Sequence, residues 1–116
     1  MPNAITADDR ALLALCDWST VEEDTPLLVR TPTMEYAVFR HGDEPFVTAD
    51  LCTHGPGSLS EGYVEGCEVE CPFHQGKFDF RTGLPTAAPC DTALRIWTAM
   101  LIDGQVCIDP DEVRGG

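Results

Sequence analysis

The segments CTHGPG (residues 52–57) and CPFH (residues 71–74) each place a cysteine and a histidine close together. The chain has only three histidines, and these segments contain two of them. Thiolate and imidazole are side chains that bind borderline-soft transition metals well. The sequence therefore predicts a four-ligand metal site formed by Cys52, His54, Cys71 and His74.

The spacing of these four residues helps to distinguish two kinds of metal site. It reads Cys-x-His, then 16 intervening residues, then Cys-x-x-His, among glycines and prolines that predict loops. A finger-type zinc site usually takes two cysteines from one segment and two histidines from another, whereas here each segment supplies one of each. A 2Fe-2S cluster with mixed ligands binds two thiolates at one iron and two imidazoles at the other. The sequence matches this second arrangement.

Short runs rich in Val, Leu, Phe, Tyr and Thr surround the two segments. Those before the first segment predict β-strands joined by tight turns, namely PLLVRT (26–31), EYAVFR (35–40) and PFVTA (45–49). Two hairpins are expected, one turning at Glu65-Gly66 and one at Asp103-Gly104. The whole pattern predicts an all-β fold, a small antiparallel β-sandwich or barrel.

Three further segments have less regular patterns. KFDFR (77–81) alternates and puts Phe78 and Phe80 on one face of a strand. TGLPTAAPC (82–90) contains a glycine and two prolines that a central strand does not accommodate, so we expect a loop there. TADDRALLAL (6–15) suits a short helix, although it is also short enough to lead into a strand.

The composition narrows the possible partners and the cellular compartment. Twenty acidic residues against seven basic ones give a net charge of −13, which repels nucleic acid and anionic membranes but suits docking onto basic protein surfaces. The chain has no apolar run of about 18 residues and no secretory signal at its start, so we expect a cytoplasmic protein without a nucleic-acid or membrane partner.

The remaining cysteines are expected to have a packing role. In a reducing cytosol, six cysteines favour metal binding or thiols over disulfides. We expect Cys16, Cys67, Cys90 and Cys107 to pack as small apolar residues. Outside the four candidate ligands, the sequence contains no nucleophile–base pair, phosphate-binding loop or second ligand set, so no catalytic residue is predicted.

The motif CTH, 16 residues, CPFH resembles the signature of Rieske iron-sulfur proteins, and the resemblance extends from about Leu15 to Ile108. It implies a single Rieske 2Fe-2S domain over residues 1–116. In this family a cluster-binding subdomain stands on a β-scaffold, and here two loops within about residues 50–90 would form it. The segment GLPTAAPC (83–90) is similar to the proline-containing loop that lies over the cluster in this family.

The resemblance also implies how the cofactor is held. It implies one Rieske-type 2Fe-2S cluster, in which Cys52 and Cys71 bind the inner iron. His54 and His74 would bind the outer, solvent-facing iron. All four positions match the family's motif without an insertion.

Four neighbouring residues distinguish branches of this family. In Rieske proteins of respiratory chains two further cysteines form a disulfide that braces the loops, and the corresponding residues here are Gly57 and Phe73. A serine and a tyrosine that hydrogen-bond the cluster in those proteins correspond to Gly76 and Phe78. Because fewer donors stabilise the reduced cluster less, we expect a potential toward the low end of the range of about −150 to +300 mV.

The chain ends soon after the region of resemblance, which makes it similar to the soluble Rieske ferredoxins of bacterial aromatic-ring-hydroxylating dioxygenases. This implies a monomeric one-electron carrier, not itself an enzyme, between a flavin-dependent NADH reductase and the terminal oxygenase. Two alternatives stay open. One is a Rieske subunit or carrier for another oxidoreductase, such as an aromatic-acid monooxygenase, and the other is a non-redox module that holds zinc at the same four residues.

Overall fold

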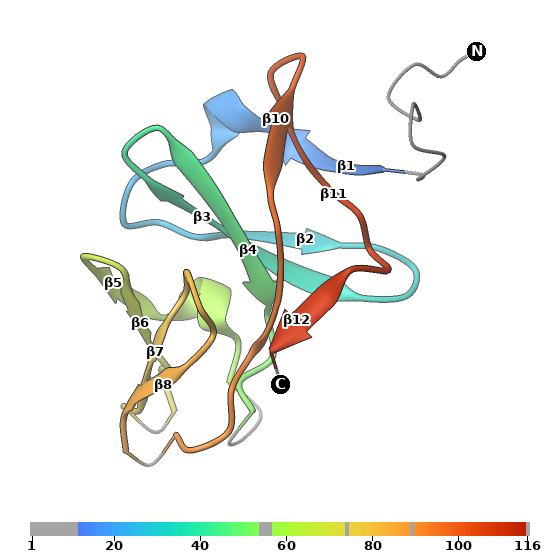
Figure 1. Ribbon diagram of the computed structural model, residues 1–116. Helices are drawn as coiled ribbons and strands as arrows, with labels where there is room; N and C mark the ends of the chain where they lie inside the picture. Colours follow the sequence, from blue (N-terminus) through green and yellow to red (C-terminus); the bar gives the residue numbers. More distant parts are fainter. Residues whose placement is uncertain (1–11, 54–56, 74, 89, 116) are drawn as a thin grey trace.

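The computed structural model describes residues 12–53, 57–73, 75–88 and 90–115, and its strands form three antiparallel sheets (Figure 1). The first sheet contains, in spatial order, β1 (Leu13–Asp17), β11 (Gln105–Ile108) and β10 (Met100–Ile102). The second contains β12 (Val113–Gly115), β9 (Arg95–Trp97), β4 (Glu44–Ala49), β3 (Glu35–His41) and β2 (Leu27–Arg30). The third contains β5 (Tyr63–Glu65), β6 (Glu68–Glu70), β7 (Lys77–Asp79) and β8 (Pro85–Ala87). The predicted antiparallel all-β fold is confirmed.

The first two sheets contain most of the strands predicted from β-branched and aromatic runs. β2, β3 and β4 coincide with the three runs before the first Cys/His segment, and β3 pairs with both of the others. The Asp103-Gly104 turn joins β10 to β11 with a positive φ at both residues (53° and 78°). A two-residue turn of this kind requires positive φ, which explains why this dipeptide predicted the hairpin correctly.

Strand β3 separates two hydrophobic cores because its successive side chains point to opposite faces. Tyr36 and Val38 belong to one core, and Ala37 and Phe39 belong to the other. We call the first the base core; its buried members are Val21, Tyr36, Val38, Val47, Ala49, Trp97, Val106 and Ile108. We call the second the loop-side core; its buried members are Ala37, Phe39, Cys52, Leu59, Val69, Cys71, Phe78, Phe80, Cys90 and Leu94.

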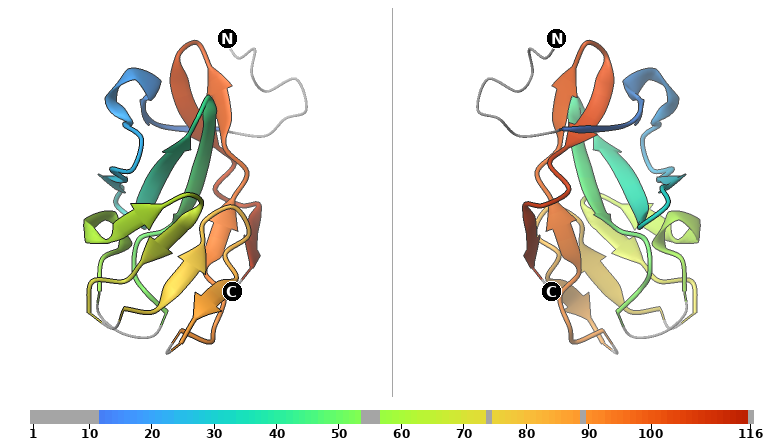
Figure 2. Two further views of the ribbon diagram at one scale, coloured as in Figure 1. Left: turned by 90° about the vertical axis from the view of Figure 1, so that its left-hand side faces the viewer. Right: turned by 90° about the vertical axis from the view of Figure 1, so that its right-hand side faces the viewer.

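The third sheet extends from the rest of the molecule, and its far end lies opposite the β10–β11 hairpin (Figures 1 and 2). The predicted hairpin is present, with Glu65 paired to Glu68 and Gly66 at φ 62° in the turn. Phe78 and Phe80 are both buried on one side, as the alternation predicted. The rings of Phe39 and Phe80 stack at 4.6 Å, which joins this sheet to β3.

The prediction of a continuous loop at residues 82–90 is wrong. Pro85 begins β8, which pairs with β7 through Phe78–Pro85 and Lys77–Ala87. Proline lacks an N–H, so it suits the first residue of an edge strand. Strand β8 is such an edge, because its only neighbour in the sheet is β7. The segment is not a central strand, as predicted, but part of it forms an edge strand.

The N-terminal segment follows the second of its two predicted possibilities where the structure describes it. Residues Leu13–Asp17 form β1, which pairs with β11. Residues 6–11 of the helix prediction lie outside the described part of the chain. The short helix η2 (Trp18–Thr20) follows β1, and the Arg40 guanidinium lies 4.4 Å from the Trp18 ring.

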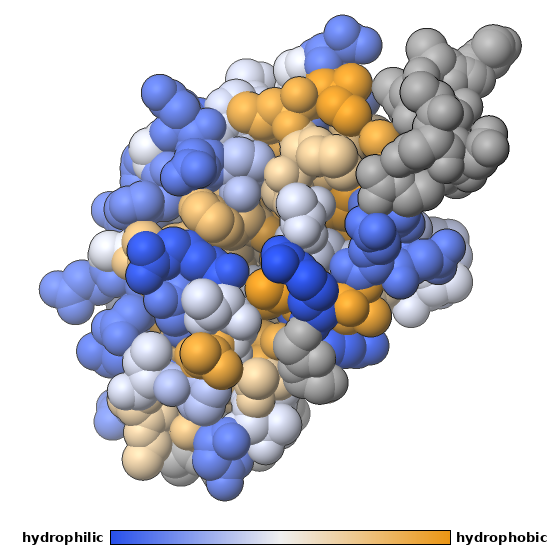
Figure 3. Space-filling view, in the orientation of Figure 1, coloured by the Kyte–Doolittle hydropathy of each residue, from blue (hydrophilic) through white to orange (hydrophobic). Residues whose placement is uncertain are grey.

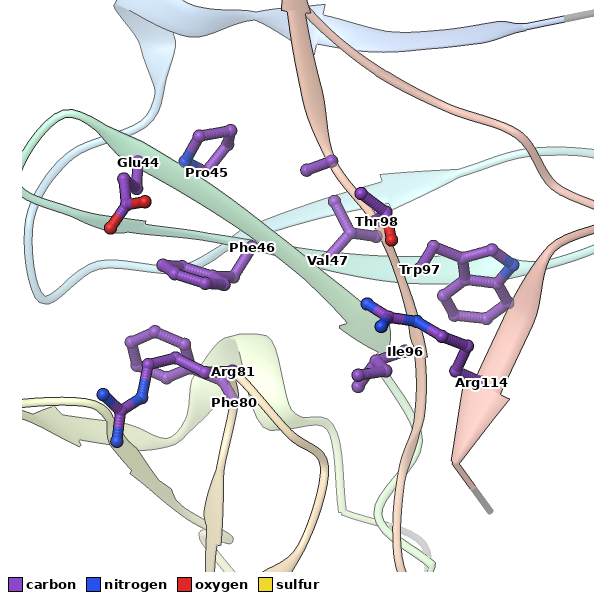
Figure 4. Close-up of a pocket in the computed structure, with 11 residues that line it drawn as sticks. Glu44, Pro45, Phe46, Val47, Phe80, Arg81, Ile96, Trp97, Thr98 and Arg114 are labelled. Carbon is purple, nitrogen blue, oxygen red and sulfur yellow. The ribbon is translucent and has the colours of Figure 1, made fainter.

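A pocket of about 200 Å³ lies between β4, β9, β12 and the turn after β7 (Figure 4). The centroids of the Phe46 and Phe80 rings lie 5.5 Å apart along its wall, and neither Cys52 nor Cys71 lines it.

The face in Figure 3 is largely hydrophilic, with hydrophobic side chains gathered near the β10–β11 hairpin. Among the described residues, no helix is long and apolar enough to cross a membrane.

Candidate functional site

Two loops at the far end of the third sheet contain the candidate cysteine ligands (Figures 1 and 2). The first loop (residues 52–57) follows β4, and the second loop (residues 71–76) joins β6 to β7. An equivalent backbone hydrogen bond closes each loop. The N–H of Cys52 donates to the carbonyl of Gly57 at 2.9 Å, and the N–H of Cys71 donates to the carbonyl of Gly76 at 2.8 Å. Each cysteine is therefore held at the neck of a six-residue loop.

The base of the first loop is fixed by the buried side chain of Asp50. Its carboxylate accepts hydrogen bonds from the Ser58 hydroxyl and from the Ser60 N–H. The Asp50 carbonyl also accepts the Leu59 N–H at 2.8 Å, at the start of η3 (Leu59–Glu61). Buried carboxylates are costly unless they are hydrogen-bonded, and these bonds satisfy the group while they anchor both ends of the loop.

The structure brings three cysteines together at this end of the molecule. Cys52, Cys71 and Cys90 are exposed by only 2%, 0% and 6%, and all three belong to the loop-side core. Burial, together with the neighbouring thiols of Cys52 and Cys71, raises the pKa of Cys90 to about 12. None of the six cysteines, all within the described residues, forms a disulfide in this structure.

Gly57 brings the two loops into contact. A Cβ atom at this position would lie 2.7 Å from the Cys71 sulfur and 3.7 Å from the Phe73 Cβ. The first distance is too short for any side chain, so glycine is needed for the close approach of the first loop to the Cys71 thiol. The second lies within the range found between the Cβ atoms of a disulfide. Positions 57 and 73 are therefore placed as the family resemblance implied, and here no bridge joins them.

Gly76 has the same role toward the third cysteine. A Cβ atom at Gly76 would lie 2.3 Å from the Cys90 sulfur and 3.0 Å from the Cys90 backbone nitrogen. Position 76 therefore has no space for the serine that corresponds to it in the Rieske proteins of respiratory chains. The space beside Gly76 is filled by the Cys90 side chain.

The structure describes two of the four predicted ligands and leaves the other two undescribed. Cys52 and Cys71 lie on adjoining loops and are both buried. His54 and His74 lie outside the described residues. Cys90 was predicted only to pack, and it does belong to a core, but it also lies against Cys52. Its spacing, 19 residues after Cys71, matches no ligand motif, so the sequence contained no signal for this contact.

The described donor set fits a cluster with two thiolate ligands. Both thiols are buried, and the absence of a side chain at Gly57 lets the first loop approach the Cys71 sulfur closely. Thiolates are the ligands that iron–sulfur clusters prefer. Within the described part of the chain, no three His, Cys, Asp or Glu side chains form a metal-binding group. Cys52, Cys71 and Cys90 are therefore not arranged as three ligands of one metal.

Comparisons with known proteins agree with this geometry. The family model of the Rieske [2Fe-2S] domain matches residues 11–98 of this chain. The chain is 50% identical to the anthranilate 1,2-dioxygenase ferredoxin subunit of Burkholderia cepacia over 84 residues, which cover 72% of this chain and 78% of that protein. It is 42% identical to the ferredoxin component of the p-cumate 2,3-dioxygenase system of Pseudomonas putida, over 94% of this chain and 95% of that protein.

A solved structure shows the same fold. The ferredoxin in the complex of reduced oxygenase and oxidized ferredoxin in carbazole 1,9a-dioxygenase superposes with a TM-score of 0.80 at 37% identity, over 87% of this chain and 94% of that chain. This chain thus shares its overall fold with that ferredoxin. The chain belongs to the Rieske [2Fe-2S] domain family, and its cofactor is one Rieske-type 2Fe-2S cluster.

Proposed function

We propose that the chain is the ferredoxin component of an aromatic-ring-hydroxylating dioxygenase system. It carries single electrons from an NADH-dependent flavoprotein reductase to the terminal oxygenase, and it is not itself a catalytic subunit. The observation that carries this proposal is the pair of buried thiols, Cys52 and Cys71, on adjoining loops of a chain whose relatives are dioxygenase ferredoxins. The alternative of a carrier for an aromatic-acid monooxygenase has weaker support, from a 34% identical ferredoxin component of the naphthalene 1,2-dioxygenase/salicylate 5-hydroxylase systems of Ralstonia sp.

We propose that Cys52, His54, Cys71 and His74 hold the cluster, with the two cysteines on the inner iron and the two histidines on the outer iron. When bound, the cluster accepts and releases one electron. The chain's own contribution is to bury the thiols, which excludes water from the inner side. Histidines on the outer iron would give the shortest route for an electron to a docked partner.

Apolar side chains support docking at this end of the molecule. Leu51 precedes the first loop and Phe73 lies within the second, and both are exposed by more than 60%. Exposed apolar groups are typical of surfaces that become buried in a complex. The carbazole 1,9a-dioxygenase structure is a complex of a ferredoxin with its oxygenase, which supports an oxygenase as the partner of this chain. The net charge of −13 favours a partner surface rich in lysine and arginine.

The test uses the purified chain with its metal. After anaerobic reduction, electron paramagnetic resonance distinguishes the mixed histidine–cysteine ligation, which gives a lower average g value, from an all-cysteine cluster. We expect the mixed signal, a midpoint potential below zero, and NADH-dependent reduction of the cluster in the presence of a dioxygenase reductase. A colourless protein that contains zinc, or an all-cysteine signal, would refute the proposal.

The working form of the carrier is also part of the proposal. We propose a cytoplasmic monomer with one domain over residues 1–116. Sedimentation or light scattering measures the mass in solution, and a single cooperative unfolding transition of the metal-loaded protein tests the single domain. A stable dimer, or two separate transitions, would contradict these two statements without affecting the cluster.

A further inference from the structure

The pocket between β4, β9 and β12 has an apolar wall and a cation at its edge (Figure 4). Thr48 of β4 pairs with Ile96 of β9, which pairs with Arg114 of β12. Paired residues, and residues two apart on one strand, point to the same face of a sheet, so the side chains of Phe46, Ile96 and Arg114 share one face. Phe80, which follows β7, lines the pocket from the third sheet. The pocket therefore lies where the second and third sheets meet.

The apolar wall of this pocket suits a flat ring. The Phe46 and Phe80 rings are tilted by 52°, and Phe80 also stacks on Phe39. Aromatic side chains bind an aromatic ligand through edge-to-face or offset stacking as well as by burying its surface. A volume of about 200 Å³ lies below the range of about 300–1,000 Å³ that is typical of sites for drug-sized ligands. The pocket therefore suits a molecule with a single ring.

Arg114 is the cation available to a ligand in this pocket. Arg81 also lines it, but the Arg81 guanidinium donates two hydrogen bonds to the Asp79 carboxylate. In the part of the chain that the structure describes, Arg114 is in no ion pair, although the chain has twenty acidic residues. A guanidinium binds a carboxylate through two parallel hydrogen bonds. The free guanidinium thus indicates a ligand with a carboxylate.

Figure 4 shows at which side of the pocket that carboxylate would lie. The Arg114 side chain extends from β12 across β9, and its guanidinium is on the same side of the pocket as the Thr98 hydroxyl. Glu44 is on the opposite side, beyond Phe46. A ligand carboxylate beside Arg114 would therefore meet two hydrogen-bond donors and stay away from the Glu44 carboxylate, which would repel it.

We propose that this pocket binds a small aromatic carboxylate, with its ring against Phe46 and Phe80 and its carboxylate on the Arg114 guanidinium. An uncharged ring would leave the guanidinium unused, and an anion without a ring would leave the apolar wall in contact with water. Neither Cys52 nor Cys71 lines the pocket, so the inference goes beyond the proposed electron-transfer role and does not rest on it.

The test is isothermal titration calorimetry of the metal-loaded protein with benzoate. A salt concentration of 0.15 M limits the repulsion from the acidic surface, because the Debye length is then about 8 Å. We expect saturable binding of one benzoate per chain. Acetate and benzyl alcohol, which each supply only half of the ligand, are expected to bind more weakly. The melting temperature should rise with benzoate, since a ligand that binds only the folded state stabilises it.

The variant Arg114→Gln tests the charged partner of the ligand. It removes a charge-assisted hydrogen bond, so we expect the dissociation constant for benzoate to rise about tenfold. Arg114 is exposed on an edge strand, and the variant is therefore expected to fold. The matched control is Arg30→Gln, which removes the same charge from β2 at the opposite edge of the same sheet. We expect this control to keep the wild-type affinity.

Three outcomes would overturn the inference. The first is the absence of saturable benzoate binding at millimolar concentrations, and the second is equal benzoate affinity in Arg114→Gln and Arg30→Gln. The third is binding of acetate or benzyl alcohol as tight as that of benzoate, because half of the ligand would then be sufficient. None of these is the failure of the proposed function, which would show as the absence of a mixed histidine–cysteine signal.

Discussion

The base core and the loop-side core share strand β3, yet they differ in what completes them. The base core is closed by Val, Ile, Tyr and Trp side chains, and the Tyr36 and Trp97 rings pack edge to face at 4.9 Å. The loop-side core contains three buried cysteines, two of them proposed ligands on loops. Loops have few backbone bonds of their own, so we expect this core to depend on the cluster that Cys52 and Cys71 are proposed to hold. We therefore expect the half around the base core to be a scaffold that folds by itself, and the half around the loop-side core to need its cofactor.

Replacing a proposed histidine ligand is expected to have the largest effect. His54→Ala would remove one of the two imidazoles proposed to bind the outer iron, so we expect loss of the visible absorption and of the paramagnetic signal. His41→Ala is the matched control, because His41 ends β3 on the exposed surface of the scaffold half. Iron content and absorption per protein measure the result. A His54→Ala protein with the full wild-type spectrum would show that the outer iron has a different ligand.

Alanine at Gly57 is expected to weaken cluster binding by steric displacement. The new Cβ atom would lie 2.7 Å from the Cys71 sulfur, so the ligand or the first loop has to move. Gly42→Ala is the control, because Gly42 has nothing within 4 Å of the added atom although its positive φ strains alanine. We expect Gly57→Ala to lose most of its iron and Gly42→Ala to lose only stability, by about 1 kcal/mol. Equal iron content in both variants would contradict the close approach.

A pair of valines compares the two cores directly. Val69 and Val106 are both fully buried, the first in the loop-side core and the second in the base core. Truncation of either to alanine removes buried methyl groups and leaves a cavity, so we expect each to lose about 2 kcal/mol of unfolding free energy. Only Val69→Ala is expected to release iron faster to a chelator. Similar release rates from the two variants would show that the loop-side core does not support the cluster.

Much of the fold followed from local sequence, because the strands of the scaffold are regular. Alternating β-branched and aromatic residues and the Asp103-Gly104 turn were sufficient for β2, β3, β4 and the last hairpin. Strand β8 could not be predicted in this way. Its existence depends on pairing with β7 at a sheet edge, a long-range contact that leaves no mark on a proline-containing segment.

The candidate site was predictable to the extent that its spacing is characteristic. Cys52 and Cys71 were predicted as ligands because each belongs to a Cys/His segment; the structure buries both, and their ligand role stays a prediction. The contact of Cys90 with Cys52 was missed because it depends on how the segment after β8 folds back over Gly76. Single residues brought together by tertiary folding have no local pattern, so only the structure could place the third thiol.

The smallest expected difference between the two halves is in how much a salt bridge contributes to the free energy of unfolding. In the loop-side half, Arg81 donates two hydrogen bonds to the Asp79 carboxylate, at 3.1 and 2.8 Å, and the Arg81 N–H donates a third at 2.8 Å. In the scaffold half, Arg30 and Glu35 form a single bond of 3.0 Å between side chains that are more exposed. Exposed ion pairs contribute little, so Arg30→Gln is expected to leave stability unchanged within error.

The ion pair of Asp79 and Arg81 is expected to make the free energy of unfolding depend on pH. The hydrogen bonds from the Arg81 side chain, with those from the Arg81 and Thr82 backbone, hold the pKa of Asp79 below its usual value of 3.8, against the opposing effect of burial. A carboxyl whose pKa is lower in the folded state stabilises the fold fully above the unfolded value and loses that contribution as pH falls through the folded value. Arg81→Gln is therefore expected to be slightly less stable than the wild type at neutral pH and equally stable once Asp79 is protonated in both. Denaturant unfolding between pH 7 and pH 3 measures the difference, and a gap that stays constant as the pH falls below 3.8 would show that Arg81 acts through packing rather than through its charge.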